Sequence, residues 1–147
     1  MELWSMQNWL WVALVFSMGC SSFDRDWKRA ASLPATTNDI AGRWEGTWRS
    51  DVNGHNGRLR CLMTKTNEST YEARYHAKYW KIFSFSYTVP MRVRRDPTGF
   101  TFTGDANLGK LAGGIYEYRG FASPTNFFAT YVSKHDHGTF RMGRPMR

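Results

Sequence analysis

The sequence predicts an all-β protein: an antiparallel up-and-down meander of about eight strands, closed as a small β-barrel. Three observations predict this fold. From Gly42 onward, apolar and polar residues alternate with a period of two, which is typical of strands with one buried face. Each alternating run ends in a cluster of Gly, Asn, Asp or Pro, which favours turns. Most connections are of hairpin length and no helical period interrupts the runs, so consecutive strands are expected to pair antiparallel.

The first three runs alternate most regularly. In "GRWEGTWR" (42–49), Gly and Trp occupy the even positions and polar residues lie between them. In "RLRCLMTK" (58–65), Leu, Cys and Met share one face. In "TYEARYHAKYW" (70–80), Tyr and Ala alternate with Glu, Arg, His and Lys. Each run therefore predicts a strand with one inner face that is apolar or small.

The later runs continue the pattern. "FSFSYTVPMRV" (83–93) has large apolar residues at odd positions, and Pro90, which has no N–H to donate, predicts an edge or a bend. The same alternation predicts strands in "FTFTGDA" (100–106), "IYEYRGFA" (115–122) and "GTFRMGR" (138–144). The run "NFFATYVS" that precedes the last of them has no clear phase. A two-layer sandwich is the alternative to a barrel, because both folds alternate in the same way.

The residues before this region predict export from the cytoplasm. "WLWVALVFSMG" (9–19) is an apolar or small run of the length of a signal-peptide core, and it is too short to span a bilayer as a helix. The next segment is polar and has no apolar periodicity. The chain is therefore expected to comprise a signal peptide (1–19), a polar tether (20–40) and a β-barrel domain (41–147).

The stretch "SMGC" resembles the processing site of a bacterial lipoprotein precursor, in which small residues precede a lipidated Cys that becomes the new N-terminus. Gly19 matches that pattern, whereas Ser17 stands where Leu is usual and the leader has no Lys or Arg. The resemblance implies a lipid on Cys20, anchoring to a membrane, and localisation in the cell envelope, in the periplasm or on the outer surface. Ordinary signal-peptidase cleavage and an uncleaved anchor are the alternatives, and translation starts at Met1 or at Met6.

The opening of the β region carries a second resemblance. Gly42-Arg43-Trp44 and Gly46-Thr47-Trp48 are each similar to the Gly-x-Trp on the first strand of calycin barrels: lipocalins, fatty-acid-binding proteins and avidin-type proteins. The resemblance implies a barrel that binds a small apolar or amphipathic ligand. Lipocalins also pair that Trp with an Arg on the last strand, for which Arg141 is the matching candidate. Their Thr-Asp-Tyr motif is absent from this sequence.

Tyrosines are frequent on the predicted inner face. A buried phenol needs a hydrogen-bond partner, so these hydroxyls either pair within a filled core or orient a ligand in a cavity. Small inner residues such as Ala77 and Gly104 would make room for a ligand. The candidate ligand-binding residues are Trp44, Trp48, Tyr71, Tyr75, Tyr79, Tyr87, Tyr116 and Tyr118.

The chain is basic, with 20 Lys and Arg against 12 Asp and Glu and a net charge of +8. The basic residues fall mostly on the predicted outer face, where they are either simply solvated or attract an anionic surface of the envelope. Nucleic acid is not an expected partner, because the aromatic residues alternate inward and leave no exposed platform on which bases would stack.

No pattern points to catalysis. The sequence has no Gly-rich phosphate loop, no nucleophile elbow and no pair of carboxylates in an apolar setting, and Cys61 on an inner face indicates packing. The two histidines of "HDH" (135–137) have no third ligand nearby in the sequence, and His55 lies in a distant turn. Neither a metal nor a cofactor is therefore expected.

The function favoured by these observations is that of a non-catalytic envelope lipoprotein whose barrel binds a small apolar or amphipathic molecule. One alternative is a structural or interaction module with a filled core that acts through its basic outer face. Its contact patch would comprise Leu62, Ile82, Ile115 and Phe121. An enzyme assembled in the barrel mouth is the other alternative.

Overall fold

The computed structural model describes residues 22–34, 38–80 and 82–146. The expected signal peptide and the lipid-bearing Cys20 lie outside the described residues. Residues 22–31 form a helix, and a short 3-10 helix, η1, spans Lys110–Ala112. The strands are β1 (Gly42–Ser50), β2 (Asn56–Lys65), β3 (Thr70–Tyr79), β4 (Phe83–Asp96), β5 (Gly99–Asn107), β6 (Ile115–Ala122), β7 (Asn126–Val132) and β8 (His137–Gly143).

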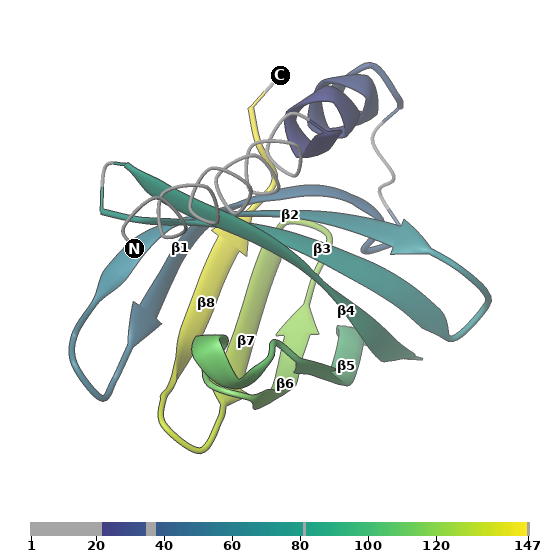
Figure 1. Ribbon diagram of the computed structural model, residues 1–147. Helices are drawn as coiled ribbons and strands as arrows, with labels where there is room; N and C mark the ends of the chain where they lie inside the picture. Colours follow the sequence, from purple (N-terminus) through teal and green to yellow (C-terminus); the bar gives the residue numbers. More distant parts are fainter. Residues whose placement is uncertain (1–21, 35–37, 81, 147) are drawn as a thin grey trace, which may run out of the picture.

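The strands form a closed antiparallel barrel (Figure 1). Each strand pairs with its neighbours in sequence, and β8 returns to pair with β1, from Gly143 opposite Glu45 to Gly138 opposite Ser50. The predicted meander and its closure are confirmed, and the sandwich alternative is wrong. The predicted inner residues supply most of the core, because successive side chains of a strand point to opposite faces.

One end of the barrel is closed by the chain that enters β1. Ile40 is fully buried there, and its carbonyl accepts a hydrogen bond from Trp44 Nε1 at 2.8 Å. The Tyr71 hydroxyl donates to the Asp39 carboxylate at 2.7 Å. These contacts fill the end of the barrel at which β1 begins, which we call the closed end.

The arginine that covers Trp44 is Arg144, not Arg141. The Arg144 guanidinium lies 3.9 Å from the centre of the Trp44 ring and donates to the Asp39 carbonyl at 2.8 Å. Phe140 points inward on β8, so Arg141 points outward, where it lies over Phe128 at 4.7 Å. Burial lowers the pKa of Arg144, while backbone carbonyls and the indole ring replace the water that its guanidinium loses. The calycin resemblance implied an arginine on the last strand, with Arg141 as the candidate, whereas the arginine that covers Trp44 follows β8.

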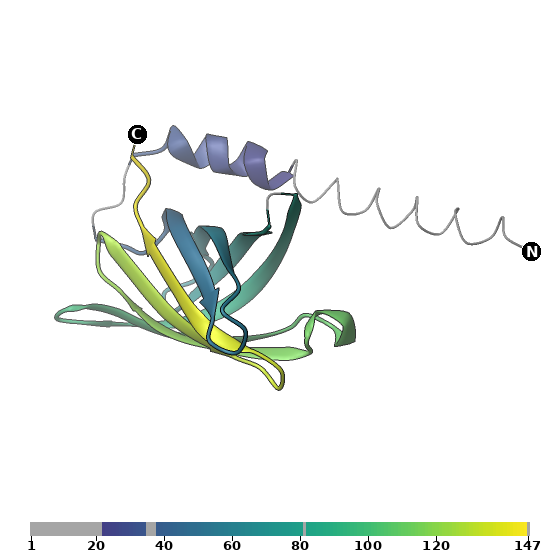
Figure 2. The same ribbon diagram turned by 90° about the vertical axis from the view of Figure 1, so that its left-hand side faces the viewer.

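The segment expected to be a polar tether contains a docked helix, so that expectation is wrong for residues 22–31. The helix lies against the outside of the barrel wall (Figure 2). Phe23 and Trp27 are buried, and their spacing of four residues places them on one face of the helix. Two apolar residues in a charged segment are a weak periodic signal, and the surface that they contact is visible only in the folded barrel.

Arginines on the outer face of β2 and β3 contact this helix. Arg60 and Arg74 lie 5.1 and 5.4 Å from the centre of the Phe23 ring. Arg60 also pairs with Asp24 at 2.8 Å, and Arg74 with Asp26 at 2.8 Å. The hydrogen bond from Arg74 lowers the pKa of Asp26. Part of the basic face that was expected to be solvated or to meet an anionic surface is therefore covered by the protein itself.

Within the described part of the chain, no helix is both long and apolar enough to cross a membrane.

Candidate ligand-binding site

The barrel interior opens to solvent at the end opposite Trp44, as a cavity of about 1020 Å³. We call this end the mouth. Its walls come from the last residues of β1 and β3, the first residues of β4 and β6, and the connections that follow β5 and β7. Aromatic and aliphatic side chains predominate in the lining: Trp48, Ala77, Ile82, Phe83, Ser84, Phe85, Ser86, Tyr87, Leu108, Leu111, Ala112, Tyr116, Tyr118, Tyr131, Asp136 and Phe140.

The mouth is wide because β4 pairs with β5 along only part of its length. The ladder between them runs from Met91 opposite Gly104 to Asp96 opposite Gly99, whereas Phe83–Pro90 pairs with β3 alone. Pro90 lies at the point where the two strands separate, and it has no N–H for a further ladder bond. The edge or bend predicted at Pro90 is confirmed. The separated first half of β4 forms one wall of the cavity.

Neutral phenols form the floor of the cavity. Tyr87 and Tyr118 line it, with ring centres 6.4 Å apart. Tyr75 lies beneath them, with ring centres 5.3 Å from Tyr87, 6.1 Å from Tyr118 and 5.2 Å from Phe140. Burial raises the pKa of Tyr75, Tyr87 and Tyr118 above the usual tyrosine value, so their hydroxyls stay protonated at neutral pH.

The Tyr75 hydroxyl is fully buried and has no hydrogen-bond partner among the described residues. A buried hydroxyl without a partner costs about 1 to 3 kcal/mol. We therefore expect Tyr75→Phe to leave the free energy of unfolding of the ligand-free protein unchanged or to raise it, as measured by urea unfolding. Tyr71→Phe is the matched control, because Tyr71 is also buried and its hydroxyl donates to the Asp39 carboxylate at 2.7 Å. Its removal is expected to cost about 1 to 3 kcal/mol. A larger loss at Tyr75 than at Tyr71 would contradict this assignment.

Asp136 supplies the one carboxylate among the described residues that border the cavity. Asp136, in the connection between β7 and β8, accepts hydrogen bonds from the Ser50 hydroxyl at 2.5 Å and from the Tyr131 hydroxyl at 3.2 Å. Its backbone N–H donates to the Ser133 hydroxyl at 3.0 Å, which fixes the turn. The carboxylate is therefore held in place at the rim by neutral donors.

Large apolar side chains are exposed around the mouth, and we call this group the lip: Trp80, Ile82, Phe83, Phe85 and Leu111. Trp80 is 70% exposed and has a φ of 49°, a left-handed conformation that is uncommon for a bulky residue. Contiguous exposed apolar surface on a folded domain generally marks a site of interaction. The lip is continuous with the cavity, because four of its five members also line it.

The structure divides the candidate residues between the two ends of the barrel. Trp48, Tyr87, Tyr116 and Tyr118 line the cavity. Tyr75 lies below its floor. Trp44 and Tyr71 belong to the closed end. The Tyr79 ring is tilted against that of Trp48 with centres 6.1 Å apart, and its hydroxyl lies 3.1 Å from His55 Nδ1. The alternating pattern predicts which face of a strand a residue occupies but not its position along the strand. Trp44 and Trp48 share a face and yet lie about 13 Å apart along the strand.

Several lining residues were not predicted as site residues. Phe83 and Phe85 were assigned to the inner face, but nothing in the pattern placed them at an open end. Tyr131 falls in the run whose phase is unclear. Asp136 lies between the two histidines of "HDH", where the sequence drew attention only to the histidines. The loop residues Leu108 and Leu111 carry no periodic signal.

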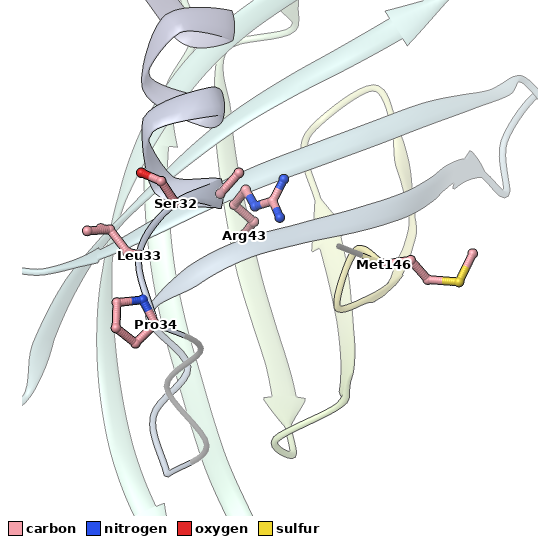
Figure 3. A pocket seen from close by; sticks show the side chains of 6 residues that line it. Ser32, Leu33, Pro34, Arg43 and Met146 are labelled. Atoms are coloured by element: carbon pink, nitrogen blue, oxygen red, sulfur yellow. The ribbon is translucent and has the colours of Figure 1, made fainter.

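Two further hollows lie beside the C-terminal end of the helix. One, of about 470 Å³, is lined by Ala31, Ser32, Leu33, Pro34, Arg43 and Met146 (Figure 3). The other, of about 880 Å³, continues from it towards Arg144 and Pro145 at the closed end. Neither is lined by the aromatic side chains that mark the mouth. The mouth is therefore the stronger candidate for a ligand site.

The histidines noted in the sequence are dispersed among other roles. His55 contacts Tyr79, and His135 and His137 are exposed. Within the ranges that the structure describes, no three His, Cys, Asp or Glu side chains gather in a way that would hold a metal ion. Burial raises the pKa of the Cys61 thiol, which keeps the nucleophilic thiolate scarce.

The fold and the site define a closed, eight-stranded antiparallel β-barrel with one plugged end and one open end. No protein-family model matches the chain, and a comparison with curated proteins finds no match. Among solved structures, a de novo designed fluorescence-activating β-barrel is similar, with a TM-score of 0.53 and 16% sequence identity. The match covers 77% of this chain and 100% of the designed one. At this identity the similarity supports the barrel fold alone.

Proposed function

We propose that this protein is a non-catalytic binding protein that holds a small apolar or amphipathic molecule in the mouth of its barrel. The observation that carries the proposal is the cavity of about 1020 Å³ with its predominantly apolar lining. Ligand pockets typically measure about 300 to 1,000 Å³ and combine apolar walls with a few polar groups. A filled barrel would instead be packed at its mouth as tightly as at its closed end.

The exposed lip supports the same proposal. Phe83 is 60% exposed and Phe85 is 41% exposed, although both occupy positions of the inner face of β4. A ligand in the cavity would cover these rings and remove apolar surface from water, which is favourable by about 25 cal/mol for each Å². Covering these rings would therefore contribute to the free energy of ligand binding. A barrel with a purely structural role would not need them to be exposed.

The cellular part of the proposal comes from the sequence. We infer a lipid on Cys20, two residues before the described helix, and hence attachment of the barrel to a membrane of the cell envelope. The net charge of +8 supports additional attraction to an anionic envelope surface. Metabolic labelling with a fatty-acid analogue tests this part, since the label should be lost in Cys20→Ser.

The alternative, an interaction module that acts through its outer face, has less support. The residues suggested for its contact patch do not form one surface. Leu62 lies on β2 beside the hollow near the helix, Ile82 belongs to the lip, and Ile115 and Phe121 lie near opposite ends of β6. Part of the basic face is also covered by the helix.

Binding is tested with Nile red, an uncharged dye whose fluorescence rises in apolar surroundings. We expect saturable binding to the full chain, and Phe85→Ser is expected to weaken it by about tenfold, the equivalent of about 1.4 kcal/mol. Phe121→Ser is the matched control, because Phe121 is 37% exposed against 41% for Phe85 but lies outside the cavity. Equal effects of the two changes, or no saturable binding, would count against the mouth as a ligand site.

A further inference from the structure

The charge inside the cavity is opposite in sign to the charge of the whole protein. The chain has a net charge of +8. Among the described residues that line the cavity, however, there is no Lys, Arg or His, and Asp136 is the one ionisable side chain other than the phenols. A ligand in the mouth therefore meets a local electrostatic environment different from the one that the outer surface presents.

Among the described residues, the Asp136 carboxylate is not paired with a cation. Its hydrogen bonds come from the hydroxyls of Ser50 and Tyr131, which are neutral. None of the ion pairs found between described residues involves Asp136. Each carboxylate oxygen accepts one of these two bonds, so each has capacity for a further donor.

This carboxylate adjoins a group of aromatic rings through Tyr131. Tyr131 donates to Asp136, and its ring centre lies 6.0 Å from that of Tyr116 and 5.2 Å from that of Phe140. Both of those rings line the cavity, as does Trp48. The faces of aromatic rings attract organic cations, and the attraction is stronger where water is excluded.

We propose that the ligand of this cavity is a hydrophobic organic cation, an amphiphile with an ammonium group that lies beside Asp136 and an apolar body that lies against the lip. This inference rests on the proposed function, since it assumes that the mouth binds an amphipathic molecule. A carboxylate or phosphate headgroup would find no cation among the described residues that line this space, and the loss of its hydration would oppose binding.

Net charge alone would favour an anionic ligand, whereas the cavity is proposed to favour a cationic one. The long-range field of a basic protein attracts anions, but salt at 0.1 M screens it over about 10 Å. A preference for the cation at that salt concentration must therefore come from groups within the cavity.

The test compares three ligands that share one alkyl chain: decyltrimethylammonium, 1-decanol and decanoate. The two ionic compounds are used below their micellar concentrations, and decanol below its solubility limit, to displace Nile red from the full chain in 0.1 M salt. We expect the ammonium compound to displace the dye at a concentration about tenfold lower than decanoate does, with decanol between them. Asp136→Asn should weaken the ammonium compound by about tenfold and leave decanol unchanged.

Asp105→Asn is the control, because it changes the net charge equally but lies exposed on β5, outside the cavity. If decanoate displaces the dye as well as the ammonium compound does, or if both Asn variants weaken the ammonium compound equally, the charge inference is overturned while ligand binding stands. If Nile red itself does not bind saturably, the proposed function fails. The comparison of the three ligands on the unaltered chain needs no variant, so it decides the question even if Asp136→Asn does not fold.

Discussion

Trp44→Ala is expected to lower the free energy of unfolding by about 3 to 5 kcal/mol, measured by urea unfolding followed by circular dichroism. Trp44 is 0% exposed, and its ring contacts Phe127 with centres 5.5 Å apart. Truncation would leave a cavity at the closed end. It would also remove the donor to the Ile40 carbonyl and the ring that faces the Arg144 guanidinium. Two buried polar groups would lose partners together with the packing.

Trp80→Ala is the matched control for this change. Trp80 is an exposed indole in the lip, and surface substitutions usually change stability by no more than about 0.5 kcal/mol. Trp48→Ala should fall between the two, because Trp48 is half-buried at the mouth and donates to the Lys78 carbonyl at 2.9 Å. A loss at Trp80 equal to that at Trp44 would mean that the closed end is not the principal anchor of the core.

Gly46→Ala is expected to weaken the ladder that closes the barrel. A Cβ at this position would lie 2.0 Å from the Arg141 carbonyl oxygen, and backbone atoms of β8 would have to move. Gly46 pairs with Met142 in the ladder between β1 and β8, which joins the two ends of the meander. We expect a loss of about 1 to 3 kcal/mol or more, measured by urea unfolding, with faster amide hydrogen exchange along β8.

Gly143→Ala tests whether that effect depends on the close approach of the backbones. Gly143 also lies on β8 and pairs with Glu45 of β1, but its Cβ would be 3.5 Å from the nearest described atom, the Thr125 carbonyl oxygen. This is an ordinary contact distance, so the free energy of unfolding should change little. If both substitutions destabilise equally, the loss reflects the removal of glycine from strands in general and not the approach of β1 to β8.

The candidate site was only partly predictable, for reasons that particular residues illustrate. Tyr87 and Tyr118 were placed correctly on inner faces by alternation, and they line the cavity. Trp44 and Tyr71 satisfied the same rule but lie at the closed end. Asp136 and Leu111 stand in connections, where no period applies. A rule that assigns faces therefore identifies core residues well and cannot separate those that pack from those that line an opening.

By itself, the sequence determined the strands, the inner face of each strand except β7, and the antiparallel order of neighbours, because alternation and short turns are local properties. Only the tertiary structure decided which residues of each inner face reach the mouth, which arginine covers Trp44, and that residues 22–31 dock on β2 and β3. These outcomes depend on the position of each residue along the barrel axis and on contacts between distant segments. A pattern with a period of two carries no information about either, since it repeats identically from one end of a strand to the other.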